Sequence, residues 1–330
     1  MKHVSILVPA GEAVLSSIVG AFKLFNAANQ FLIQSGQQTE PFFEVDLVGI
    51  QDETNLYGGL FNVRPTKLIS EIKKTDLIIV TTLVGDLDKE LEANAPFVQW
   101  IKEQRAMHGT EVASLCVGAF LLAETGLLNG KSCATHWAYA DRFRARYPQI
   151  NLLGEKIICE ENGIYSSGGA YSFLNLLLHL IEKNCGRETA IWCSKMFEIE
   201  FDRSNQNQFV VFNGQKDHAD EPIKQAQQFI ESNFNEKISV EKLADMAAIS
   251  RRNFVRRFKK ATDNTPIEYI QRVKIEAAKR SLESTPDNVS EVMYKVGYID
   301  TRAFRSMFKK HTGLSPMAYR SKYNREMASA

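Results

Sequence analysis

Short apolar runs alternate with longer amphipathic segments along the first two hundred residues. The runs with the length and composition of buried strands are 4–8, 45–50, 77–82, 112–115 and 164–166. The segments between them predict helices at 13–34, 88–106, 118–126, 137–146, 170–184 and 187–200. Strands that are apolar throughout are typical of a mostly parallel sheet covered on both faces. The pattern therefore predicts a doubly wound α/β domain over residues 1–205.

The pattern changes after residue 205. Residues 206–220 are polar, rich in Asn and Gln, and lack periodicity, so they are predicted to be a linker whose apolar patch at 209–212 docks elsewhere. Ile223, Ala226 and Ile230 then follow at the spacing of one helix face. Residues 221–325 are expected to form an all-α domain.

An internal repeat of about 50 residues lies within this second domain. Seven residues recur at an offset of 50: Phe254, Phe258, Lys259, Lys260, Thr262, Pro266 and Tyr269 return as Phe304, Phe308, Lys309, Lys310, Thr312, Pro316 and Tyr319. Upstream the offset is 49, because Leu243, Ala247 and Ala248 match Val292, Val296 and Gly297. Each copy is predicted to be a helix-turn-helix unit, and the second copy has one extra residue in its turn.

The second helix of each copy is predicted to bury two phenylalanines and to expose basic residues opposite them. Ser250 and Asp300 are the expected N-caps. Such a helix fits the DNA major groove, where Arg bonds guanine and Lys neutralises phosphates. The candidate DNA-binding residues are Arg251, Arg252, Val255, Arg256, Lys259 and Lys260 in the first copy, and Arg302, Arg305, Ser306, Lys309 and Lys310 in the second.

Charged residues also cover ordinary solvated helix faces, but here the basic residues recur on the same face of both copies. The charge balance favours the DNA interpretation. Residues 1–220 carry 19 Lys and Arg against 26 Asp and Glu, whereas residues 221–330 carry 21 against 13. The net charges of −7 and +8 indicate two functional units, of which the basic one is suited to a polyanion. The helix from Pro266 to Leu282 would hold the two copies about 34 Å apart, one DNA turn.

The stretch 221–323 resembles the AraC-type DNA-binding domain. The motifs are L-A-x-x-A-x-x-S from Leu243, R-x-F-K from Arg256, V-G-Y from Val296 and F-K-K-x-x-G-x-S-P-x-x-Y-R from Phe308. This resemblance implies binding to double-stranded DNA and an encounter with RNA polymerase. One departure is Ser306, which stands where the family usually has arginine, so that base contact would pass to Arg305 or Arg302.

Cys116 has the sequence context of a nucleophile in the first domain. Ser114-Leu115-Cys116-Val117-Gly118 follows a predicted strand and opens a helix, which would place the thiol on a strained turn above the sheet. The helix N-terminus, and His136 further on, could lower the pKa of the thiol. The other interpretation is a small buried apolar residue, which is the one we adopt for the remaining cysteines, Cys133, Cys159, Cys185 and Cys193.

Residues 1 to about 200 resemble the PfpI superfamily, which is related to class I glutamine amidotransferases. With the second domain, the whole chain resembles the GlxA subfamily of AraC-type regulators, through 114–124, 126–130, 135–137 and 167–170. The resemblance implies a flavodoxin-like fold, a homodimer, and a small effector such as an amino acid or a quaternary amine. Leu15 and Ser16 stand near the position of the enzymes' acidic residue, Glu12 is a weak substitute, and Ser114 replaces a glycine.

An effector pocket is expected where open α/β sheets bind ligands, at the carboxyl ends of the strands. The residues assigned to it are Pro9, Gly11, Cys116, Val117, His136 and Gly168. A simple tight turn is the other interpretation of Gly168, and a redox signal at Cys116 is the alternative to a bound metabolite.

Two function classes follow. The favoured one is a sequence-specific transcriptional regulator whose enzyme-like domain binds a small metabolite, so that Cys116 and His136 are vestigial. The alternative is an active cysteine-dependent amidase, hydrolase or glyoxalase-like enzyme that carries a DNA-binding module. Loss of turnover in Cys116→Ala would favour the alternative.

The composition narrows the class of protein further. With 44% apolar and 24% charged residues, the chain has the composition of an ordinary globular protein. The five cysteines include no C-x-x-C pair, so they predict neither a disulfide framework nor a clustered metal site. Their odd number and spacing fit a protein of the reducing cytoplasm. No cofactor is expected. No apolar run approaches the length of about 18 residues that a membrane span needs.

Overall fold

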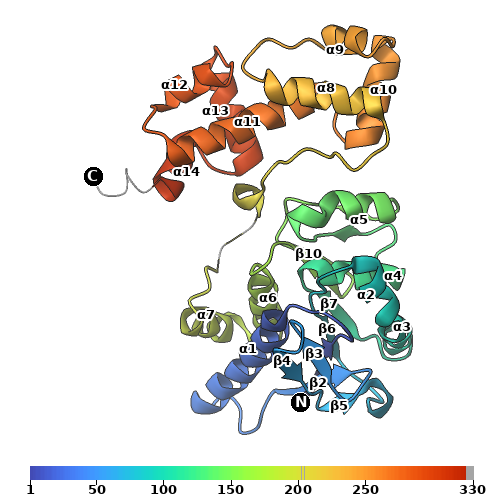
Figure 1. Cartoon of the computed structure of the whole chain (residues 1–330). Helices are drawn as coiled ribbons and strands as arrows, with labels where there is room; N and C mark the ends of the chain where they lie inside the picture. The colour runs from blue at the N-terminus through green and yellow to red at the C-terminus, as the bar shows by residue number, and fades with distance from the viewer. Residues whose placement is uncertain (202, 204, 325–330) are drawn as a thin grey trace. The chain divides into compact units, whose positions relative to one another are not determined.

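The computed structural model describes residues 1–201, 203 and 205–324. They form two compact units, Met1–Gln206 and a second that begins at Asn207 (Figure 1). The first unit is built on a seven-stranded sheet of order β10-β11-β7-β6-β1-β2-β5. The strands are β1 (Lys2–Val8), β2 (Phe43–Gly49), β5 (Lys67–Leu68), β6 (Leu77–Val80), β7 (Glu111–Ser114), β10 (Ile158–Glu161) and β11 (Ile164–Ser167). All neighbours are parallel except β10 and β11.

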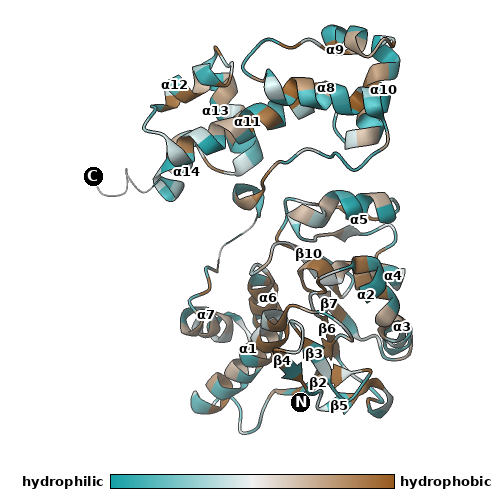
Figure 2. Ribbon diagram, viewed as in Figure 1, coloured by the Kyte–Doolittle hydropathy of each residue, from teal (hydrophilic) through white to brown (hydrophobic). Residues whose placement is uncertain are grey.

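Helices cover both faces of this sheet. One apolar core includes residues of α1 (Leu15–Gln34), α6 (Phe173–Cys185) and α7 (Arg187–Met196), and the other includes residues of α2 (Leu87–Ala93), α3 (Ala95–His108), α4 (Ala119–Glu124) and α5 (Ala140–Arg146). Successive residues of β1 serve opposite cores: Ile6 packs in the first and Leu7 in the second. Figure 2 shows hydrophobic residues gathered on the central strands and α6. The doubly wound α/β fold predicted from the sequence is confirmed.

The structure adds details that the strand and helix pattern did not predict. The predicted helix at 88–106 is two helices, because α2 ends before Asn94 and α3 begins with Pro96 in its first turn. Two small sheets are also present: β3 (Thr54–Leu56) pairs with β4 (Phe61–Val63), and β8 (Ser132–Cys133) pairs with β9 (Asn151–Leu152).

The second unit is helical and contains both predicted helix-turn-helix units. α9 (Val240–Met246) and α10 (Arg251–Thr262) form the first, and α12 (Val289–Lys295) and α13 (Thr301–Thr312) form the second. α8 (Glu221–Ser232) precedes them and α14 (Pro316–Tyr323) follows. The long helix α11 (Pro266–Ser284) joins the two helix-turn-helix units. It contributes Tyr269 to the apolar core of the first helix-turn-helix unit and Leu282 to the apolar core of the second.

The stretch from Asn207 to Asp220 belongs to the second unit and packs on its helices. The Phe212 ring meets Tyr269 edge to face at 5.1 Å, and the Lys279 ammonium donates to the Val210 carbonyl. Gln227 Nε2 donates to the Gln215 carbonyl at 2.8 Å. Of the apolar patch at 209–212, Phe212 therefore packs against α11, whereas Phe209 and Val211 stay exposed. In the described ranges, no helix is both long enough and apolar enough to cross a bilayer.

Candidate functional site

The recognition helices α10 and α13 are anchored by the residues that recur in the repeat. Phe254 and Phe258 are fully buried in the core of the first helix-turn-helix unit, and Phe304 and Phe308 are fully buried in the core of the second. Phe258 packs edge to face on Tyr269 at 5.3 Å, and Phe308 packs in the same way on Tyr319 at 5.4 Å. The seven shared positions thus include the residues that hold each helix in place.

Both predicted N-caps are confirmed. Ser250 Oγ accepts a hydrogen bond from the Asn253 backbone N–H at 3.4 Å, and Asp300 Oδ1 accepts one from the Ala303 N–H at 2.5 Å. The caps set where each helix begins, and therefore which side chains its first turn presents.

The candidate DNA-binding residues lie on the outer faces of these helices. Apart from the half-buried Val255, all of them are exposed. In α13 several line one open hollow of about 460 Å³, which is formed by Thr301, Arg302, Arg305, Ser306, Lys309 and Ser315. The structure thus brings four candidates of the second copy together on one basic surface.

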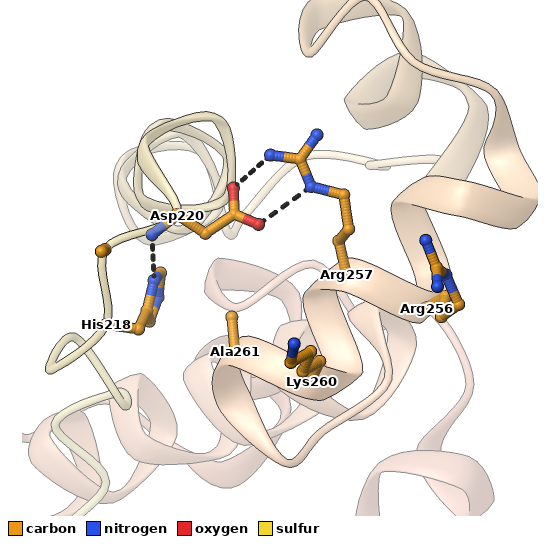
Figure 3. A pocket seen from close by; sticks show the side chains of 7 residues that line it. His218, Asp220, Arg256, Arg257, Lys260 and Ala261 are labelled. Carbon is orange, nitrogen blue, oxygen red and sulfur yellow. Dashed lines mark hydrogen bonds and ion pairs between the residues drawn. The ribbon is translucent and has the colours of Figure 1, made fainter.

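The first recognition helix borders a hollow of about 400 Å³ (Figure 3). Arg256, Arg257 and Lys260 line it, together with the 218–220 segment. Asp220 accepts two hydrogen bonds from Arg257, and Figure 3 shows Arg256 standing apart from this pair. The Arg257 guanidinium is thereby paired with a carboxylate of the same protein. This ion pair could not be predicted from the position of Arg257 in the sequence.

Other side chains of α10 have partners on their own helix or on α9. Arg256 Nη2 donates to Asn253 Oδ1 at 2.9 Å, and Arg251 Nε lies 2.8 Å from Glu241 Oε1. All four side chains are at the surface, so these contacts are weak and exchangeable.

A second candidate site lies in the first unit, where β1, β6, β7 and β11 end. A cavity of about 220 Å³ is lined there by Val14, Ser16, Thr82, Leu83, Val84, Cys116, Val117, His136, Tyr139, Ala170, Tyr171 and Phe173. Each strand end thus contributes to the lining, as the carboxyl edge of an open α/β sheet does. Apart from a thiol, a neutral imidazole and two phenols, the lining has no ionisable group.

Cys116 is the first residue of a short 3₁₀ helix, Cys116–Gly118, which follows β7 after Leu115. Its φ of +55° is in the left-handed region, which is strained for a residue with a side chain. The Cys116 N–H donates to Ser167 Oγ at 3.2 Å, and Thr135 Oγ1 donates to the Cys116 carbonyl at 3.0 Å. A Cβ at Gly118 would lie 2.5 Å from the Thr81 carbonyl oxygen, so this turn requires glycine there. The predicted strand–turn–helix context is confirmed.

The thiol is nevertheless not activated. Burial raises the pKa of Cys116 to about 12, and the Val117 N–H and the Thr82 hydroxyl offset this only in part. The lowered thiol pKa considered from the sequence is therefore wrong, because desolvation outweighs the helix N-terminus.

His136 is placed to cap a turn. Its Nδ1 accepts the Ala138 N–H at 3.1 Å, which leaves the proton of the neutral ring on Nε2. Burial lowers its pKa and favours this neutral form. In the described part of the chain no hydrogen bond joins His136 to the Cys116 thiol. The pair thus lacks the base contact that a cysteine nucleophile needs.

Three residues assigned to the pocket from the sequence do not line the cavity. The Pro9 carbonyl accepts a hydrogen bond from Thr54 Oγ1 at 3.0 Å. A Cβ at Gly11 would lie 2.2 Å from Glu90 Oε2, and one at Gly168 would lie 2.4 Å from Gln206 Nε2. Their surroundings are filled by protein side chains. The aromatic part of the lining was not predicted, because no motif marks Tyr139, Tyr171 or Phe173.

Glu12 is also accounted for. Its carboxylate accepts the Tyr57 N–H at 2.9 Å and the Gly58 N–H at 3.2 Å, so it caps the β3–β4 turn. Val14 and Ser16 line the cavity instead. The acidic partner that the enzymatic relatives place near the thiol has no counterpart among the residues that line this cavity.

One group of candidate metal ligands occurs among the described residues, namely His3, Glu44 and Asp46. Asp46 Oδ2 already lies 2.6 Å from the Lys67 ammonium and 2.9 Å from His3 Nε2. The lysine occupies the position of a cation, so this group is an ion-pair network.

Two family models match the chain. The DJ-1/PfpI family model matches residues 38–183, and a helix-turn-helix domain model matches residues 243–322. The fold and the two sites therefore define a DNA-binding regulator whose first domain has an enzyme-like fold. The chain joins a DJ-1/PfpI domain to an AraC-type helix-turn-helix domain, and it is a transcriptional regulator of that type.

Similar proteins agree with this assignment. The HTH-type transcriptional regulator GbdR of Pseudomonas aeruginosa is 26% identical over 303 residues, 92% of this chain and 80% of GbdR. ArgR, an HTH-type transcriptional regulator of the same species, is 25% identical over 69% of this chain and 70% of its own length. The crystal structure of Drosophila melanogaster DJ-1beta matches 60% of this chain and 98% of its own with a TM-score of 0.50 at 14% identity, which shows the fold alone.

Proposed function

We propose that the DJ-1/PfpI domain binds a small effector in the cavity beside Cys116 and does not turn it over. The observation that carries this proposal is the combination of an open cavity with a protonated thiol and a neutral His136. A domain whose cysteine lacks a base can keep the fold of an enzyme family without its catalytic activity. The GlxA-like arrangement inferred from the sequence fits this reading.

The lining restricts the effector. At about 220 Å³ the cavity is smaller than the 300–1,000 Å³ of typical drug-sized sites, so it suits a small metabolite. The lining holds no Lys, Arg, Asp or Glu that could neutralise an effector charge. The hydroxyls of Ser16, Thr82, Tyr139 and Tyr171 and the ring of His136 are the groups that would fix its orientation.

The DNA-binding units are proposed to act in pairs. Two-fold dimers are the commonest soluble oligomers, and a dimer of the first domain would present two basic units to paired sites on DNA. Such a regulator would work in the cytoplasm beside its DNA and RNA polymerase. Sedimentation of the full chain as a monomer at micromolar concentration would contradict the dimer.

A thermal-shift screen of the full chain against a metabolite library tests the effector site. A ligand that binds the native state raises the unfolding temperature by mass action. The shift should be lost in Tyr171→Ala and Val117→Phe, which open and fill the cavity, and should persist in Tyr57→Ala, an exposed tyrosine outside the cavity. A shift that survives both cavity variants would place the effector elsewhere. Turnover of the hit by the wild type, lost in Cys116→Ala, would establish the enzyme instead.

A further inference from the structure

The two helix-turn-helix units differ by one residue, and the structure identifies which one. Both turns contain a left-handed residue, Ala248 with φ +52° and Gly297 with φ +74°. The next residue makes the same contact in both, since the Ile249 N–H bonds the Ala244 carbonyl and the Tyr298 N–H bonds the Met293 carbonyl. Ser250 then caps α10 directly, whereas Asp300 caps α13 only after Ile299. The residue without a counterpart is Ile299.

The Ile299 side chain does not pack in the apolar core. Ile249 and Tyr298 are both partly buried against their respective cores, and the Tyr298 ring lies 5.4 Å from Phe304. Ile299 is 90% exposed, more than any other large apolar side chain in the described part of the chain. Its side chain therefore contributes little to folding.

Its position is next to the base-reading end of α13. In helix-turn-helix proteins the N-terminal residues of the recognition helix contact base edges. Ile299 directly precedes the Asp300 cap, and the first turn continues with Thr301 and Arg302, which line the basic hollow. An exposed isoleucine thus stands at the edge of a polar, basic surface.

The major groove offers such a side chain one apolar partner. Base edges there present hydrogen-bond donors and acceptors, and the C5-methyl group of thymine is the apolar exception. We propose that Ile299 is a specificity-determining residue that packs on a thymine methyl in the half-site read by α13. This inference rests on the DNA-binding function of the chain.

The experiment removes the methyl group from the DNA and the isoleucine from the protein. Preferred sites are first selected from a randomised duplex pool with the full chain, and Arg302→Ala identifies the half-site that α13 reads. Each thymine in that half-site is then replaced by deoxyuridine, which lacks the methyl group. Affinities are measured by fluorescence anisotropy at one salt concentration.

One thymine is expected to respond. Its replacement should weaken wild-type binding about fourfold, the value of one buried methyl-sized group. Ile299→Ser should bind the thymine and deoxyuridine sites equally, and Ile299→Val should keep most of the difference. Ile267→Ser, the same change at an exposed position of α11, should leave the wild-type difference intact.

Two results would overturn the inference while leaving DNA binding in place. One is a selected half-site without a preferred thymine. The other is an equal response to deoxyuridine in the wild type and in Ile299→Ser. If selection yields no preferred sequence at all, sequence-specific binding fails together with the role of Ile299.

Discussion

The Arg257 guanidinium forms a bidentate pair with the Asp220 carboxylate, with 2.9 Å from Nε to Oδ2 and 2.7 Å from Nη2 to Oδ1 (Figure 3). Asp220 is also the N-cap of α8, since its Oδ1 accepts the Ile223 N–H at 3.4 Å. One side chain thus joins the start of α8 to the recognition helix α10. Because a bidentate pair fixes orientation as well as distance, it sets how α10 is held.

Asp220→Asn tests this pair, because asparagine keeps the cap and removes the charge. The hydrogen bonds from Arg257, with the helix N-terminus, hold the pKa of Asp220 below its ordinary value. The stabilisation is therefore present above the ordinary aspartate pKa of about 4 and is lost as the pH falls through the lowered pKa. Calorimetry should show a lower unfolding temperature for the variant at pH 7 and a shrinking difference on acidification. Asp217→Asn, a change at an exposed neighbour, should match the wild type at pH 7. An effect of Asp220→Asn that does not shrink on acidification would contradict the account.

The equivalent turns of the two helix-turn-helix units make a matched pair. Ala248 pays about 1–2 kcal/mol for its left-handed backbone, so Ala248→Gly should be neutral to stabilising by about 1 kcal/mol after the chain-entropy cost of glycine. Gly297→Ala should destabilise by more than about 2 kcal/mol, because its Cβ would lie 2.3 Å from the Asn235 carbonyl oxygen. Urea unfolding measures both. Effects of the same sign in the two variants would argue against equivalent turns.

The reactivity of Cys116 follows from its burial. With a pKa of about 12, almost all of the Cys116 thiol is protonated at pH 7. Alkylation by iodoacetamide, followed by mass spectrometry of the Cys116 peptide, should be slow and should keep accelerating up to pH 10. A rate that levels off near neutral pH would reveal an activated thiolate and revive the enzymatic and redox alternatives.

The salt dependence of DNA binding separates the two kinds of basic residue. Lys260→Ala should weaken binding to every sequence alike and reduce the slope of log affinity against log salt by about 0.9, the value for one phosphate contact. Anisotropy titrations at several salt concentrations measure this. An unchanged slope would show that Lys260 does not contact a phosphate. The hollow beside α10 that Lys260 lines would then have another role.

Much of the fold could be predicted because its signals are local. The apolar strands, the repeat and the caps at Ser250 and Asp300 each depend on spacing or on a single residue type. Asn162-Gly163, with φ of +53° and +71°, is a two-residue hairpin signal that would have predicted the antiparallel β10.

The site was less accessible to prediction. Most of the lining of the cavity comes from segments that follow four strands of the main sheet, which only the sheet order brings together, and His136 and Tyr139 come from the segment after β8. Tyr171 belongs to no periodic pattern. The pKa of Cys116 depends on burial by distant residues, which a motif does not report. The pairing of Asp220 with Arg257 joins positions 37 residues apart.

The central claim is that α10 and α13 read a DNA sequence, and base-by-base specificity tests it most directly. Sites selected from a randomised pool with the full chain are compared for the wild type and Arg256→Ala by anisotropy. Loss of one bidentate arginine contact should cost about 1–3 kcal/mol at particular base pairs and leave the others unchanged. Wild-type binding with no preference among sequences, or a variant that weakens all sequences equally, would contradict the claim.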